Sequence, residues 1–164
     1  MHKRTFKRND GRDLFLYGNH PHLEKNTVQL EITPASTPHL RWNPARQEWV
    51  TYSAGRTSRT TFPPEEYCPL CPSGKNKFPT EIPFNNFEIA VFPNRWSSFN
   101  TNSNKIKIPN IISKPSNGHC EVVVYSSEHL DTIAEMPIEK ITLLTETWID
   151  RYKNLLPRKD IKYV

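Results

Sequence analysis

The 164-residue sequence contains no long hydrophobic run. No stretch approaches the roughly 20 apolar residues that a membrane-spanning helix requires. The segment from Met1 to Arg8 also lacks the apolar stretch of a signal peptide. These two absences argue against a transmembrane or secreted protein, and we expect a cytoplasmic protein without a membrane partner.

Cysteine is scarce, with Cys68, Cys71 and Cys120 only. An odd number of cysteines, two of them three positions apart, does not fit the disulfide framework of a small secreted domain. The pattern favours metal ligation in a reducing compartment.

Apolar residues are rather few and prolines many, since the hydrophobic fraction is 35% and there are 15 prolines. This composition favours loops and short edge strands over long helices. Eight Phe, six Tyr and four Trp nevertheless argue against disorder, because buried rings offset the entropy lost on ordering. The length is that of one ordinary domain.

The formal net charge of +5 suits an anionic partner, whether nucleic acid, a phosphorylated metabolite or a membrane surface. Charge alone does not choose among them. The aromatic residues lie mostly in strand-like runs rather than interleaved with a basic stripe, which argues against a nucleic-acid partner.

Local patterns predict a strand-rich chain. Residues 1–12 carry five Lys and Arg without periodicity, and we expect a basic, weakly ordered lead-in before a domain over residues 13–164. Apolar, alternating or β-branched runs then predict strands at Leu14–Tyr17, Thr27–Ile32, Phe87–Phe92 and Glu121–Tyr125, the last in the centre of a sheet, and a hairpin over 39–52. Residues 161–164 alternate like the start of another strand.

One long helix is predicted from Pro137 to Leu156. Pro137 suits the first helical turn, and Pro157 blocks continuation. Apolar residues recur at three- and four-residue steps and predict one buried stripe, made of Ile138, Ile141, Leu144, Trp148, Tyr152 and Leu155.

Cys68 and Cys71 form a C-x-x-C pair in a proline-bearing loop, a spacing that lets both thiolates bind one zinc ion at about 2.3 Å. No second such pair exists, so further ligands must come from Cys120 or from His2, His20, His22, His39, His119 and His129. His129 is the best placed, just past the end of a predicted strand. We expect Cys120 to pack as a small hydrophobic residue, and His119 stays open.

The same pair has two other interpretations: ordinary loop thiols, or a redox pair. A redox motif normally opens a helix after a strand, whereas Pro72, Ser73 and Gly74 predict a turn here. Zinc is therefore the favoured interpretation.

Two loops carry groups that can bind a nucleotide phosphate. Arg56 and Arg59 stand among hydroxyl side chains, and guanidinium pairs can clamp phosphate. Asn94, Arg95 and Trp96 offer an amide, a guanidinium and an aromatic plane. On chemistry alone, solvated loop arginines are the commoner outcome.

The order of these motifs resembles that of the galactose-1-phosphate uridylyltransferase family. The motifs are Arg41–Pro44 with Glu48–Val50, then Ser53–Arg59, Cys68–Cys71, Phe92–Trp96 and Val122–His129. The resemblance runs from about Gly11 to the end of the chain and covers about the first half of a typical family enzyme.

This resemblance implies that Cys68, Cys71 and His129 bind Zn²⁺, and that Arg56, Arg59 and Asn94 contact the substrate. It also implies that the fourth zinc ligand and the catalytic histidine belong to a His-Pro-His motif beyond Val164, so we expect no catalytic residue in this chain and no turnover by it alone. His20, Pro21 and His22 have the same letters at a different place, and we interpret them as a turn.

The implied fold is α+β and histidine-triad-like (HIT-like), a curved, mostly antiparallel sheet with one long amphipathic helix. The implied enzyme is a nucleotidyltransferase of galactose metabolism, acting on UDP-glucose and galactose 1-phosphate through a uridylyl-histidine intermediate, and a homodimer. Two alternatives remain open: an ADP-sugar adenylyltransferase or phosphorylase on the same framework, and a non-catalytic, zinc-stabilised binding module.

Overall fold

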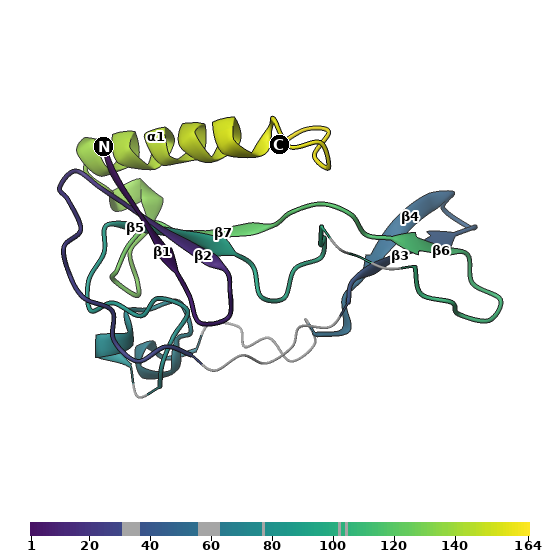
Figure 1. Cartoon of the computed structure of the whole chain (residues 1–164), viewed down its shortest axis with the longest axis horizontal. Coiled ribbons are helices and arrows are strands. Elements are labelled where there is room, and N and C mark those ends of the chain that lie inside the picture. Colours follow the sequence, from purple (N-terminus) through teal and green to yellow (C-terminus); the bar gives the residue numbers. More distant parts are fainter. Residues whose placement is uncertain (31–36, 56–62, 77, 102, 104) are drawn as a thin grey trace. The chain divides into compact units, whose positions relative to one another are not determined.

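The structure, a computed structural model, describes residues 1–30, 37–55, 63–76, 78–101, 103 and 105–164 (Figure 1). Its contacts divide the chain into two compact units, where the sequence predicted one domain. The first unit comprises Met1–Ile32, Thr60–Phe92 and Val122–Leu155, and the second comprises Thr33–Arg59, Pro93–Glu121 and Leu156–Val164.

The first unit is built on a four-stranded sheet in the order β1-β2-β5-β7. Its strands are β1 (His2–Lys7), β2 (Asp13–Gly18), β5 (Ile89–Pro93) and β7 (Glu121–Val124), and β2 is antiparallel to both β1 and β5. The unit also contains helix α1 (Ile138–Leu155) and, among its described residues, the 3-10 turns η2 (Glu65–Tyr67), η3 (Ser73–Lys75) and η4 (Ile133–Glu135).

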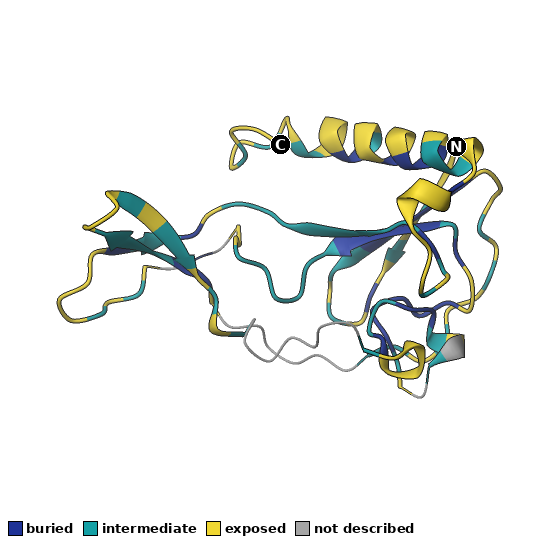
Figure 2. Cartoon of the chain, turned by 180° about the vertical axis from the view of Figure 1, so that it is seen from behind, coloured by how far each residue is buried: buried dark blue, intermediate teal, exposed yellow. Residues whose placement is uncertain are grey.

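Both faces of this sheet are covered. Successive side chains of β2 and β5 enter different apolar clusters, as the two-residue period of a strand requires. One cluster faces the segment after the cysteines and contains Leu14, Leu16, Ile82, Phe84, Phe87, Ala90 and Phe92. The other is covered by the buried side of α1 (Figure 2) and contains Tyr17, Ile89, Val91, Leu143 and Leu144. A sheet buried on both faces needs continuous apolar runs, which is what β2 and β5 have.

The lead-in expected to be weakly ordered contains a regular strand, and this expectation is wrong for His2–Lys7. Strand β1 pairs with β2 along its whole length, and Phe6 packs against the first apolar cluster. The basic residues of this segment are paired: Lys3 Nζ lies 2.6 Å from the Asp150 carboxylate, and Arg8 Nη1 lies 2.5 Å from that of Glu81.

Helix α1 has the predicted bounds to within one residue, but it buries a different face. Its buried residues are Leu143, Leu144, Thr147 and Arg151, so only Leu144 of the predicted stripe is among them. Ile138 is 68% exposed and Trp148 49% exposed. Two contacts with β2 favour the observed orientation of the helix about its axis. Tyr17 Oη donates to Asp150 Oδ2 at 2.6 Å, and the Arg151 guanidinium lies 4.0 Å from the Phe15 ring centroid.

The second unit contains a three-stranded antiparallel sheet in the order β4-β3-β6. The predicted hairpin is confirmed as β3 (His39–Asn43) and β4 (Glu48–Tyr52), and β6 (Ser113–Pro115) was not predicted. Asn43 Oδ1 accepts from the backbone of Ala45 at 3.1 Å and forms the turn. Trp42 and Trp49 pair across the strands with ring centroids 5.5 Å apart.

Three other strand predictions were wrong in the described residues. Residues 27–30 form no strand, and Val28 is largely exposed. Strand β7 lies at one end of its sheet rather than in the centre. Residues 161–164 form no strand. The described part of the chain is thus a mixed α/β fold of antiparallel sheets and one long helix, and that helix is too polar to cross a membrane.

Candidate metal centre

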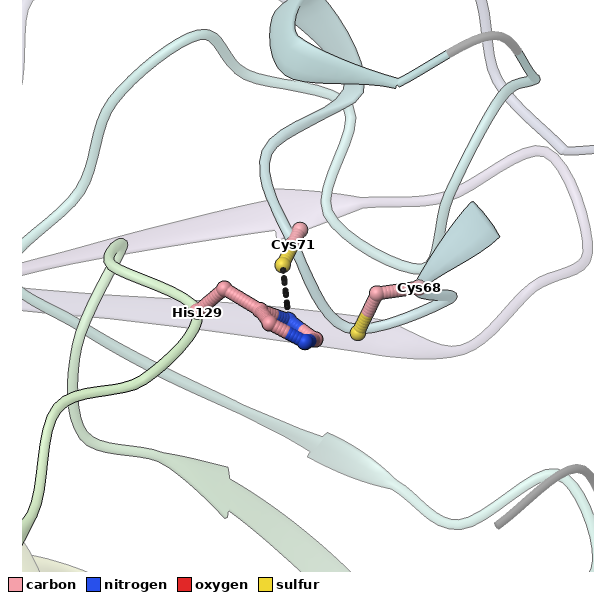
Figure 3. A group of neighbouring side chains, drawn as sticks. All are labelled: Cys68, Cys71 and His129. Carbon is pink, nitrogen blue, oxygen red and sulfur yellow. Dashed lines mark hydrogen bonds between the residues drawn. The ribbon is translucent and has the colours of Figure 1, made fainter. Parts of the chain in front are cut away.

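Three potential metal ligands meet in the first unit. The donor atoms of Cys68, Cys71 and His129 all lie within 4.8 Å of one another, and Cys71 Sγ is 3.3 Å from His129 Nδ1. Figure 3 shows the three side chains pointing toward a common point. Both cysteines are buried and His129 is half-buried. The group therefore joins two segments that are 58 residues apart in sequence.

Backbone hydrogen bonds shape the loop that carries the two cysteines. The 3-10 turn η2 leads directly into it, and Cys68 N donates to Glu65 O at 3.1 Å. Cys71 N donates to Cys68 O at 3.4 Å, and the donor atoms of both cysteines lie within 4.8 Å of each other. Asn76 Nδ2 donates to Cys68 O at 3.1 Å and closes the loop. Pro64 and Pro72, at the N-caps of two 3-10 turns, fit this tight path.

A hydrogen-bond network holds the loop that carries His129. Ser126 Oγ accepts from Glu128 N at 3.1 Å and from Lys140 Nζ at 3.0 Å, and it donates to the Asp131 carboxylate. Lys140 Nζ also lies 3.1 Å from Asp131. The hydrogen bonds from Ser126, followed by those from Lys140, lower the pKa of Asp131. The ends of the histidine loop are thereby tied to the first turn of α1.

The donor set fits a soft or borderline divalent ion. Two sulfurs and one imidazole nitrogen around a tetrahedral zinc ion lie about 3.5–3.8 Å apart, given its bond lengths of about 2.3 Å to sulfur and 2.0–2.1 Å to nitrogen. The distance of 3.3 Å between Cys71 Sγ and His129 Nδ1 is slightly shorter than this range, and all three donor atoms lie within 4.8 Å of one another. Oxygen-seeking ions such as Mg²⁺ or Ca²⁺ do not favour thiolates. The residues present therefore suit zinc, with one tetrahedral position left to another ligand.

The other histidines considered as ligands are not in this group. His119 Nε2 lies 3.1 Å from Glu121, and His39 Nε2 accepts from Arg41 Nε at 2.9 Å. His20 is exposed. His129 is thus the histidine that the fold brings to the cysteines among the described residues.

His22 is a packed residue. Its ring meets Phe84 edge-on with centroids 4.8 Å apart, and its buried Nε2 has no hydrogen-bond partner among the described residues. Burial lowers the pKa of His22, and the positive charge of Arg4 lowers it further.

The residues expected to bind substrate are not part of this group of potential metal ligands. Arg56 and Arg59 lie outside the described residues. Asn94 is in the second unit, where its Oδ1 accepts from Trp96 N at 2.9 Å and so forms a turn. The Arg95 guanidinium lies 5.1 Å from the Trp96 ring centroid. The side-chain amide nitrogen of Asn94 donates to no residue in the described part of the chain.

Sequence reasoning missed the residues that surround the metal ligands. Ser126, Asp131 and Lys140 hold the histidine loop, and Thr80 and Glu81 contact the cysteine loop. The one available signal was Glu81 next to Ile82, a charged residue that begins an apolar segment. Nothing local in the sequence indicates that this carboxylate is buried.

Comparison with known proteins identifies the family. A family model described as "Galactose-1-phosphate uridyl transferase, N-terminal domain" matches residues 28–164. The chain belongs to this family.

Two relatives of this chain are named galactose-1-phosphate uridylyltransferase. The protein from Thermotoga maritima is 34% identical over 129 residues, which cover 76% of this chain and 38% of the relative. The protein from Streptomyces lividans is 28% identical over 158 residues, which cover 94% of this chain and 40% of the relative. The chain thus spans about two fifths of the length of these relatives.

A solved structure described as "Structure of uridylyltransferase" is also similar. It is 21% identical in sequence, and the match has a TM-score of 0.45 and covers 71% of this chain and 36% of that chain.

Proposed function

We propose that this chain forms the N-terminal, metal-binding and nucleotide-binding part of a UDP-glucose–hexose-1-phosphate uridylyltransferase of galactose metabolism. The observation that carries the proposal is the meeting of Cys68, Cys71 and His129 in a chain that belongs to this family. The names of the two relatives support uridylyl transfer to galactose 1-phosphate as the activity of the whole protein, and the uridylyl donor that we propose is UDP-glucose.

The proposed metal is Zn²⁺, held by Cys68, Cys71 and His129. Zinc in such a site stabilises the fold by linking segments distant in sequence. A reducing compartment such as the cytoplasm, the location we propose, would keep both thiols available. The one His-Pro-His in these 164 residues, His20 to His22, is not part of the proposed chemistry, because His22 packs on Phe84.

The proposed substrate contacts are Arg56, Arg59 and Asn94. Two guanidinium groups can stabilise the charge of a diphosphate, and an amide can donate to a phosphate or ribose oxygen. We further propose that the four-stranded sheet with α1 belongs to a HIT-like fold and that the protein assembles as a homodimer.

Metal content and nucleotide binding test the proposal. Elemental analysis of the chain purified without added metal should find about one zinc per chain. Equilibrium dialysis at several salt concentrations should then show stronger binding of UDP-glucose than of ADP-glucose. Asn94→Ala and the double change Arg56→Ala with Arg59→Ala should weaken this binding, while Arg46→Ala should not. Arg46 is a suitable control because its side chain is 72% exposed and pairs with Glu48.

Each alternative predicts a different result. Preference for ADP-glucose would indicate an adenylyl-transferring or phosphorylase activity in place of uridylyl transfer. Zinc without affinity for either sugar nucleotide would indicate a binding module. A chain that holds no zinc after purification and takes up none on addition would refute the metal centre.

A further inference from the structure

A short buried segment runs beside the cysteine loop. Thr80, Glu81 and Ile82 are only 2%, 1% and 0% exposed, and Ile82 forms a parallel β-bridge with Pro72, the residue after Cys71. We call residues 80–82 the strap. Buried polar groups are nearly always hydrogen-bonded within the protein. In the strap, Glu81 Oε1 is the buried side-chain atom that has no such partner among the described residues.

The strap contacts the backbone of the metal-binding loop on both sides of Cys71. Glu81 N donates to Pro69 O at 2.9 Å, between the two cysteines. The Thr80 hydroxyl donates to Cys71 O at 2.7 Å and accepts from Ile82 N at 3.1 Å. One hydroxyl thus links the carbonyl of a metal ligand to the backbone of the strap.

A buried ion cluster fixes the strap from its other side. Arg8 Nη1 donates to Glu81 O at 2.6 Å and to Glu81 Oε2 at 2.5 Å. Arg12 Nη2 donates to the same Oε2 at 2.7 Å and to Asp10 at 2.6 Å. Both arginines belong to the connection between β1 and β2, so the cluster ties the strap to the β1-β2 hairpin.

The charges of this cluster balance. Two guanidinium groups face the carboxylates of Asp10 and Glu81, and the Glu81 side chain is 2% exposed. A buried carboxylate with charged hydrogen-bond partners keeps one position, because leaving it would strand buried charges. Glu81 therefore holds the strap at a defined distance from the hairpin, and the strap holds the cysteine loop.

We propose that Thr80 and Glu81 are positioning residues for the metal centre. They act through the backbone of the cysteine loop: the Thr80 hydroxyl holds the carbonyl of Cys71, and Glu81 N holds the carbonyl of Pro69, which lies between the two cysteines. This inference rests on the metal site proposed above. Groups that orient metal ligands typically change metal affinity by about 10–100-fold when they are removed.

Thr80→Val is the sharpest test, because it removes the hydroxyl and keeps the shape of the side chain. Thr27→Val is the matched control: the Thr27 hydroxyl is also buried in the first unit and has no hydrogen-bond partner among the described residues. Cobalt(II) is the probe, since its thiolate charge-transfer and ligand-field bands report ligand geometry. Titration of the whole chain, in competition with a chelator, measures affinity, and circular dichroism of the metal-free protein checks the fold.

We expect Thr80→Val to weaken cobalt binding by about tenfold or more and to shift the ligand-field bands, with the metal-free fold unchanged. Glu81→Gln should change affinity and bands in the same direction. Thr27→Val should bind within about twofold of the unchanged chain, because it removes no contact to the loop.

The outcomes separate the two proposals. If the unchanged chain binds no cobalt, the metal centre is refuted and the positioning role with it. If it binds cobalt and Thr80→Val matches it in affinity and spectrum, the positioning role alone is refuted. An equal loss in Thr27→Val would also refute it, because any small change in the core would then have the same effect. If Glu81→Gln fails to fold, Thr80→Val decides.

Discussion

Metal binding should raise the thermal stability of the first compact unit by a predictable amount. The three ligands come from loops 58 residues apart, and an unfolded chain does not hold them together. A ligand that binds only the folded state stabilises it by about 2.7 kcal/mol when its free concentration is 100 times the Kd. Since 1 kcal/mol shifts the Tm of a chain of this length by about 2–4 °C, the expected increase is about 5–11 °C.

The assay is differential scanning calorimetry at a fixed free zinc concentration, repeated with excess chelator. Cys71→Ser should lose the zinc-dependent increase, because serine oxygen is a poor zinc ligand. Cys120→Ser is the matched control, since Cys120 is a free cysteine outside the cluster, and it should keep the increase. The same zinc-dependent increase in Cys71→Ser as in the unchanged chain would refute the reasoning, as would its loss in Cys120→Ser.

Other contacts of the first unit give three further predictions. The pKa of His22 is lower in the folded than in the unfolded state, so the unfolded chain binds the extra proton first. The contribution of His22 to the free energy of unfolding should therefore be fully present above about pH 6.5 and should be lost as the pH falls below it. Urea midpoints measured from about pH 7.5 to 5 should depend less on pH in His22→Gln than in the unchanged chain. Tyr17→Phe removes the hydrogen bond to Asp150 and should cost about 1.5–3 kcal/mol of unfolding free energy in urea titrations; a loss below about 0.5 kcal/mol would contradict this. Leu144→Ala should cost about 2–5 kcal/mol in the same assay, whereas Trp148→Ala on the exposed face should cost about 0.5 kcal/mol or less, and equal losses would mean that α1 buries its other side.

Elements whose signals are local could be predicted from the sequence. The hairpin of β3 and β4 follows from the turn chemistry of Asn43 and the alternating residues beside it. The bounds of α1 follow from Pro137 and Pro157 on either side of a helical pattern. In both cases the deciding residues lie within a few positions of the element.

Elements decided by distant partners were predicted poorly. Strand β1 was missed because the basic residues of the segment 1–12 suggested solvation, whereas Lys3 and Arg8 of this segment pair with the carboxylates of Asp150 and Glu81. The prediction of which face of α1 is buried was wrong for the same reason. Apolar periodicity within the helix does not indicate that the Arg151 guanidinium lies over the Phe15 ring.

The sequence by itself determined the family of this protein and the chemistry it can offer, since the order of the motifs and the spacing of Cys68 and Cys71 are properties of the chain. It also predicts His129 as the best-placed third ligand, and the structure places this residue beside the two cysteines. Only the tertiary structure decided which groups surround these ligands: the strap, the buried Arg8–Glu81 pair and the Ser126 network. The physical reason is that ligand type depends on the residue, whereas ligand position depends on contacts between segments that fold together from distant parts of the chain.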